Sequence, residues 1–114
     1  MDTDDIACRT TLGVSDVLPP GLQNTGRPST GGVILTASGL TFVGGTDDLR
    51  FLAFATATAD KPWEIKLASS IEATPITYMG ADGRQFVTAV ATGGSLRGSD
   101  VTNDEIIAFA LPKQ

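Results

Sequence analysis

The sequence contains no histidine and a single cysteine among its 114 residues. Histidine is the usual general base of enzymes and the most frequent metal ligand. Its absence excludes a Ser-His-Asp triad, a His-paired cysteine nucleophile and a standard zinc site within one chain. One cysteine cannot form an internal disulfide, so cysteine usage does not indicate a redox compartment. We identify no set of metal ligands in the sequence.

Basic residues are also scarce: 8 Lys and Arg stand against 13 Asp and Glu, for a formal net charge of −5. They form no cluster, and nucleic-acid binding requires a basic face for the phosphates, so we expect no nucleic-acid partner. No apolar run approaches the roughly 20 residues that span a membrane. Residues 1–5 lack the basic and apolar parts of a signal peptide. We therefore expect neither a membrane span nor an export signal in this chain.

Short apolar runs separated by turn residues are what the sequence does contain, with 13 glycines and only 18% charged residues. No segment shows a helical period, and this pattern is typical of an all-β fold. We predict strands over residues 33–37, 40–43, 50–56, 63–67, 74–79, 86–91 and 105–111, with a weaker eighth strand over 6–12. Residues 14–32 and 92–104 are predicted loops.

A repeat is visible, because Val33-Ile34-Leu35-Thr36 recurs as Thr74-Pro75-Ile76-Thr77 about 41 residues later. A four-stranded propeller blade needs roughly 40 to 45 residues, so the repeat favours about two four-stranded antiparallel blades. A small β-sandwich has similar strand spacing and is the alternative. We divide the chain into the outer strand of a preceding blade (1–13), a loop (14–32), a full blade (33–67) and three inner strands of a last blade (68–114).

The residues that carry this pattern resemble a known family. The stretches 24–44, 46–54, 73–78, 83–87 and 104–112 are similar, in order, to the C-terminal part of quinoprotein dehydrogenases that depend on PQQ (pyrroloquinoline quinone). The likeness is closest to the membrane-bound glucose dehydrogenase type. It covers nearly the whole chain, so it is more specific than any single motif. The resemblance implies a quinoprotein-type β-propeller, of eight blades in the complete enzyme.

The family's blades carry a tryptophan docking motif of the form Ala-x-Asp-x-x-x-Thr-Gly-x-x-x-Trp. Ala53, Thr58 and Trp63 fit it, whereas Ala55 and Ala59 stand where Asp and Gly are expected. Residues 3–9 look like the tail of a preceding motif, with Cys8 in place of its tryptophan. We expect Trp63 to act as a structural dock between blades rather than to stack on a cofactor, because it alternates with Ile65 and Leu67.

The resemblance implies PQQ near the propeller axis with a calcium-type divalent cation beside it, and a sugar or alcohol as the substrate. The expected catalytic base and most ligands would belong to upstream blades, so the catalytic residues of this chain are unknown. Family members act in the periplasm, and this chain shows no signal peptide. PQQ binding by this chain alone is not expected.

Four residues are candidate contributors to the cofactor site by their positions in the resemblance: Asp48, Gly31, Gly32 and Arg27. Asp48 could orient a cofactor or its cation, or it could cap its own turn. The two glycines could let the backbone approach a flat cofactor, or they could relieve crowding near the axis. Arg27, in one loop with Asn24 and Thr25, could meet a substrate or quinone oxygen, or it could be a solvated loop arginine.

Three functions are compatible with these observations. The first is a C-terminal fragment of a PQQ-dependent sugar or alcohol dehydrogenase, not catalytic alone, whose partner would be the missing upstream blades. This hypothesis expects a truncated chain, because residue 1 falls inside a tryptophan motif. The second is a self-assembling homo-oligomeric propeller, in which four copies give eight blades and hide the open sheet edges. The third is a non-catalytic β binding module.

Overall fold

The structure is a computed structural model, and it describes residues 5–6, 8–27, 29, 31–93 and 102–111. This part of the chain contains strands and turns and no helix, as the sequence predicts. The strands are β1 (Val33–Leu35), β2 (Leu40–Val43), β3 (Arg50–Ala55), β4 (Trp63–Lys66), β5 (Ile76–Met79), β6 (Gln85–Gly93) and β7 (Thr102–Ala110). Consequently no helix of the described chain is long and apolar enough to cross a membrane.

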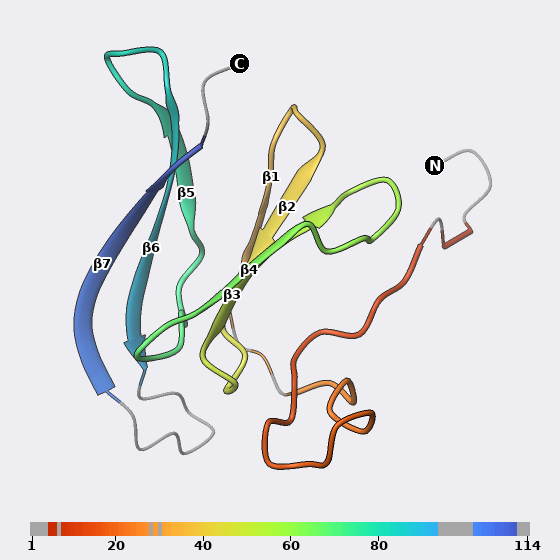
Figure 1. Cartoon of the computed structure of the whole chain (residues 1–114). Coiled ribbons are helices and arrows are strands. Elements are labelled where there is room, and N and C mark those ends of the chain that lie inside the picture. The colour runs from red at the N-terminus through yellow and green to blue at the C-terminus, as the bar shows by residue number, and fades with distance from the viewer. Residues whose placement is uncertain (1–4, 7, 28, 30, 94–101, 112–114) are drawn as a thin grey trace.

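The strands form two antiparallel sheets, one of four strands in the order β1-β2-β3-β4 and one of three in the order β5-β6-β7. Every strand pairs with its neighbour in the sequence, so each sheet is a meander (Figure 1). Tight turns make this possible. Gly39 joins β1 to β2 with a φ of 88°, and Gly83 joins β5 to β6 with a φ of 79°, both in the left-handed region that glycine accepts without a Cβ clash.

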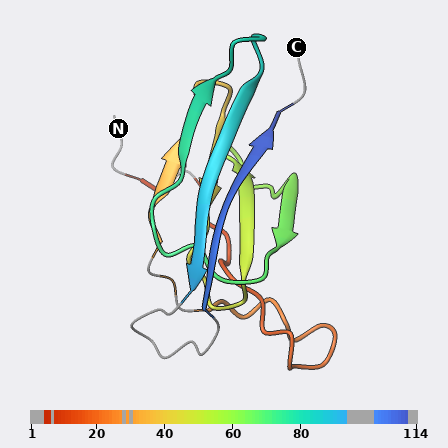
Figure 2. The ribbon, with the colours of Figure 1, turned by 90° about the vertical axis from the view of Figure 1, so that its left-hand side faces the viewer.

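The core lies between the two sheets, which pack face to face (Figure 2). Phe51 is its centre and has no exposed surface. Its ring centroid lies 6.0 Å from Phe42, 5.8 Å from Trp63 and 5.8 Å from Phe109. Trp63 on β4 also meets Phe109 on β7 edge-on, at 5.2 Å and 73°. Since these two aromatic residues belong to different sheets, the interpretation of Trp63 as a structural dock is confirmed.

A second, smaller cluster covers the opposite face of the first sheet. Val43, Leu52 and Phe54 are buried there, and Leu12 of the N-terminal segment packs against them. The corresponding face of the second sheet has no such covering segment among the described residues, and Ile76, Tyr78 and Ile106 are exposed. The two sheets therefore differ in how completely they are covered.

The seven main strands lie where the sequence predicts them, within a few residues. The main difference is in the second glycine-rich loop, because the β6–β7 ladder continues past a bulge between Ala91 and Gly93 to Thr102. Residues 94–101 of that predicted loop lie outside the described residues. The described residues of the predicted strand 6–12 pair with no strand of this chain. They were assigned to a preceding blade, so the assignment stays a prediction, as does the division of the chain into four parts.

Candidate functional site

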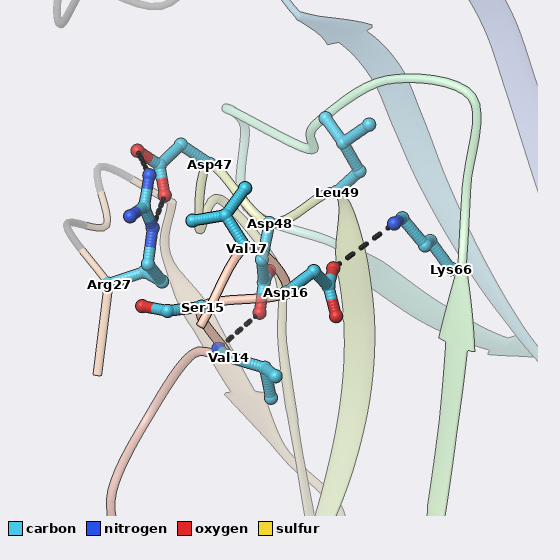
Figure 3. A pocket seen from close by; sticks show the side chains of 9 residues that line it. All are labelled: Val14, Ser15, Asp16, Val17, Arg27, Asp47, Asp48, Leu49 and Lys66. Carbon is cyan, nitrogen blue, oxygen red and sulfur yellow. Dashed lines mark hydrogen bonds and ion pairs between the residues drawn. The ribbon is translucent and has the colours of Figure 1, made fainter. Parts of the chain in front are cut away.

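A small polar pocket lies at one end of the first sheet, where the loop over residues 14–27, the β2–β3 turn and the end of β4 meet (Figures 1 and 3). The turn begins at Gly44-Gly45, and Gly45 has a φ of 85°. The two aspartates that follow in the turn, Asp47 and Asp48, line the pocket. The cavity measures about 190 Å³. Its walls are formed by Val14, Ser15, Asp16, Val17, Arg27, Asp47, Asp48, Leu49 and Lys66.

Asp48 is the buried acid of this pocket. One carboxylate oxygen accepts hydrogen bonds from the Thr46 hydroxyl and, at 3.2 Å, from the backbone N–H of Arg50. The other accepts the backbone N–H of Val14 at 2.7 Å (Figure 3). Asp48 thus bonds within its own turn, to Thr46 and Arg50, and the same side chain also anchors the long N-terminal loop to the turn. An aspartate with this many donors is held rigidly in place.

Arg27 forms a two-pronged ion pair with Asp47 across the mouth of the pocket (Figure 3). Its Nε lies 2.6 Å from one carboxylate oxygen and its Nη2 lies 2.7 Å from the other. The carboxylate raises the pKa of Arg27 above its ordinary value, chiefly by hydrogen bonding. The side chain is therefore not simply solvated, and its planar guanidinium is already committed to a protein carboxylate.

Asp16 is the residue that sequence reasoning missed. Arg50 donates two hydrogen bonds to its carboxylate, at 3.0 and 2.9 Å, and Lys66 donates one at 3.1 Å. These donors, Arg50 first, lower the pKa of Asp16 to about 2. Nothing in the local sequence indicates this network, because Asp16 lies 34 residues from Arg50 and 50 from Lys66. Only the fold of the loop brings the three together.

Gly31 and Gly32 lie beside the pocket rather than in its walls. A Cβ at Gly31 would stand 2.7 Å from the Gly44 carbonyl oxygen and 2.8 Å from that of Ile71. A Cβ at Gly32 would overlap the Thr74 hydroxyl. Both positions are crowded by the protein itself, so glycine is required there with or without a cofactor. Of the neighbouring loop residues, Thr25 bonds Ser15 through their hydroxyl groups at 3.1 Å, and Asn24 is exposed.

An apolar groove of about 580 Å³ opens between the sheets at another place, lined by aromatic and aliphatic side chains such as Trp63, Phe42 and Phe109. Its size is that of a small-molecule site, but such sites also need a few converging polar groups to orient a ligand. Its lining residues carry no charged or polar side chain besides the Trp63 indole N–H. We therefore regard it as packing space between the sheets.

Asp48→Ala tests the structural importance of the buried carboxylate. The change leaves the Thr46 hydroxyl and two backbone N–H groups without their acceptor, and we expect a loss of about 3 kcal/mol in the free energy of unfolding. Asp47→Ala is the matched control, because its ion pair with Arg27 is partly exposed and such pairs contribute about 1 kcal/mol or less. Urea unfolding followed by circular dichroism measures both; equal losses would contradict this account.

Meandering antiparallel sheets packed face to face, with a tryptophan docked between them, are compatible with two blades of a β-propeller and with a small β-sandwich. The crystal structure of quinohemoprotein alcohol dehydrogenase from Comamonas testosteroni is similar, with a TM-score of 0.64 and 29% identity over 76% of this chain and 14% of that one. The likeness settles the fold in favour of the propeller over the sandwich. Residues 1–87 match the PQQ glucose/ethanol/alcohol dehydrogenase β-propeller domain. The chain belongs to this family of quinoproteins.

Relatives of known sequence agree with the family. A probable quinate dehydrogenase (quinone) from Xanthomonas campestris pv. juglandis is 34% identical over 98% of this chain, and quinoprotein glucose dehydrogenase A from Acinetobacter calcoaceticus is also 34% identical over 98%. This chain covers 15% of the first relative and 14% of the second. It therefore spans about one seventh of the length of the proteins that it resembles.

The described residues do not form a PQQ site by themselves. PQQ is a flat tricyclic quinone with three carboxylates, so its site needs free donors and space. The cavity of about 190 Å³ is below the roughly 300 Å³ at which small-molecule sites begin. Three of its lining residues are aspartates, and its cations Arg27 and Lys66 are paired with two of them. Among the described residues, no three acidic or cysteine side chains gather in a set able to hold a metal ion.

Proposed function

We propose that this chain supplies two adjacent blades of a PQQ-dependent sugar or alcohol dehydrogenase propeller and does not catalyse oxidation alone. The observation that carries the proposal is the Asp48 pocket, in which Arg27 is paired with Asp47, Lys66 is paired with Asp16, and Asp48 accepts a backbone N–H. The pocket is small and its charges are satisfied internally, so it supports the architecture of the propeller rather than a reaction. The share of about one seventh of its relatives' length is consistent with this role.

Within an assembled propeller, the pocket end of the first sheet is the part that would approach the cofactor. The loop over residues 14–27 and the β2–β3 turn gather at that end (Figure 1). Arg27 and Asp48 would hold this surface rigid, and Gly31 and Gly32 would keep the backbone close to the turn. A contribution of these four residues to a PQQ site, with a calcium-type cation, requires ligands from other blades and stays a prediction.

Two measurements test the proposal. Titration of the purified chain with PQQ and Ca²⁺, followed by the absorbance of the quinone, should show no stoichiometric binding. Dye-linked oxidation of glucose and ethanol should show no turnover, with a complete family dehydrogenase as the positive control. Saturable PQQ binding together with dye reduction by this chain alone would contradict the proposal.

A chimera tests the positive half of the proposal. The segment of Acinetobacter calcoaceticus glucose dehydrogenase A that aligns with this chain is replaced by this chain. We expect PQQ-dependent dye reduction to be retained in part, whereas the same enzyme with the segment deleted should be inactive. A soluble, folded chimera with no more activity than the deletion variant would show that the chain is not a functional pair of blades.

A further inference from the structure

In the second sheet, one face is uncovered and the β7 edge is unpaired among the described strands. Among the described residues, the face that points away from the first sheet is largely uncharged: Ile76, Tyr78, Val90 and Ile106 are exposed large side chains, and Asp104 of β7 is a charged member. This edge strand, β7, spans nine residues, and β6 is its one partner among the described strands. A largely apolar face beside an open edge, on a chain of net charge −5, is a surface on which another sheet can pack. Smaller or less exposed members of the face are Phe86, Thr88, Ala108 and Ala110.

The unpaired backbone groups of β7 are arranged like those with which β3 pairs with β4, the fourth strand of the first sheet. In the first sheet, Leu67 N–H donates to the Leu49 carbonyl at 2.7 Å, so by alternation the backbone groups of Phe51 and Ala53 point toward β4. The side chains of Phe51 and Ala53 lie on the face that packs against the second sheet.

In the second sheet, Leu111 N–H donates to the Gln85 carbonyl at 2.8 Å. By the same alternation, the backbone groups of Ile106 and Ala108 point to the open edge, and their side chains lie on the uncovered face. The backbone groups of Ile106 and Ala108 are therefore directed toward the place of a fourth strand, as those of Phe51 and Ala53 are directed toward β4.

Residues 8–12 have the sequence of such a strand. Cys8 occupies the motif position of Trp63, so Thr10 and Leu12 correspond to Ile65 and Leu67. In the structure this segment is extended coil. Its described residues from 8 to 11 form no backbone–backbone hydrogen bond with other described residues. Within the described part of the chain, the hydrogen bond that Cys8 makes is donated by its thiol to the Thr56 carbonyl at 3.7 Å.

The segment cannot reach β7 of its own chain. Leu12 packs on the face of the first sheet that points away from the second sheet. Figure 1 shows the N-terminal segment and β7 on opposite sides of the first sheet. No segment among the described residues is placed to pair with the open edge of β7, and a second copy of this chain carries a segment with the matching sequence.

We propose that residues 8–12 of a second copy add to β7 as an antiparallel fourth strand, with Cys8 opposite Ala108 as Trp63 stands opposite Ala53. The inference goes beyond the proposed function, because a ring of identical copies contains none of the other blades of the dehydrogenase. Each copy donates one strand and accepts one, so the contact is head-to-tail and closes into a ring when the rotation allows. With two sheets per copy, four copies complete the eight blades that the family resemblance implies.

Disulfide cross-linking tests the proposed register, because Cys8 is the native chain's one cysteine. Paired residues of this kind have Cα atoms about 5.5 Å apart, within the range of a disulfide. In Ala108→Cys, mild oxidation should link successive copies and give a ladder on a non-reducing gel that ends at four chains. The controls are the unchanged protein and Met79→Cys, whose new thiol is exposed on the other edge strand, β5. Equal cross-linking in Met79→Cys, or none in Ala108→Cys, would overturn the proposal.

A second experiment does not depend on cysteine chemistry. Ala108→Pro removes the outward N–H of β7 without removing a bond to β6, whereas Ala108→Thr keeps that N–H. Light scattering should give a multiple of the chain mass for the unchanged protein and for Ala108→Thr, and a single-chain mass for Ala108→Pro, with circular dichroism confirming the fold. A single-chain mass for the unchanged protein at every concentration would overturn the proposal. That result would leave the PQQ titration and the chimera unaffected, so the two proposals fail separately.

Discussion

Gly45→Ala is expected to reduce the free energy of unfolding by about 3–5 kcal/mol, a large part of the stability of a small domain. Gly45 has a φ of 85°, in the left-handed region that costs other residues about 1–2 kcal/mol. A Cβ there would also overlap the backbone of Gly31 and lie 2.8 Å from the Ile71 carbonyl oxygen. Backbone atoms cannot turn aside as a side chain can, so the junction between loop and sheet must shift.

Gly39→Ala is the matched control for this prediction. Gly39 has nearly the same φ, 88°, but a Cβ there meets nothing within 4 Å. Its substitution should therefore show the conformational cost alone, about 1–2 kcal/mol. Urea unfolding of both variants, monitored by Trp63 fluorescence, separates the two contributions. Equal losses in the two variants would mean that crowding at Gly45 is unimportant.

Phe51→Ala is the second change with a large expected effect, a loss of about 3–5 kcal/mol. Phe51 is completely buried, and its ring touches Phe42 on β2, Trp63 on β4 and Phe109 on β7. The cavity would lie between the two sheets, so we expect the sheets to lose their fixed packing together. The same unfolding assay applies, with loss of the near-ultraviolet circular dichroism as an additional sign.

Phe86→Ala is the control for Phe51. Phe86 stacks on Tyr78 at 5.5 Å, on the uncovered face of the second sheet. Removal of a partly exposed ring leaves no closed cavity, so the loss should be clearly smaller, about 1 kcal/mol. Because Phe86 lies on the proposed docking face, both variants are compared at a concentration where each is a single chain. A larger loss in Phe86→Ala than in Phe51→Ala would contradict the position of the core between the sheets.

The strand content could be predicted because turn residues mark its boundaries. β2 begins and ends where the sequence predicts, since Gly39 precedes Leu40 and Gly44 follows Val43. The alternation of Trp63, Ile65 and Leu67 identified the inner face of β4 correctly. β7 was predicted too short, because Thr102 and Asn103 have no apolar pattern and join the ladder only through pairing with β6.

The site could be predicted only in part. The capping role of Asp48 follows from its local sequence, since Thr46 and Arg50 are two residues away on either side. Its bond to Val14, 34 residues distant, does not. The pairing of Arg27 with Asp47 likewise depends on how a proline- and glycine-rich loop folds back, for which sequence periodicity gives no signal. The family resemblance placed these residues in a site without giving their partners.

The meander of each sheet bears on how such proteins gain or lose parts in evolution. Strands pair only with their sequence neighbours, and the two sheets meet mainly through side chains such as Phe51, Trp63 and Phe109. A duplication or deletion of about one blade in the gene would therefore leave every remaining strand its own partner and would change only the packing between sheets. Propellers can accordingly gain or lose whole blades. A piece of two sheets keeps the strand pairing within each blade and the packing between adjacent blades.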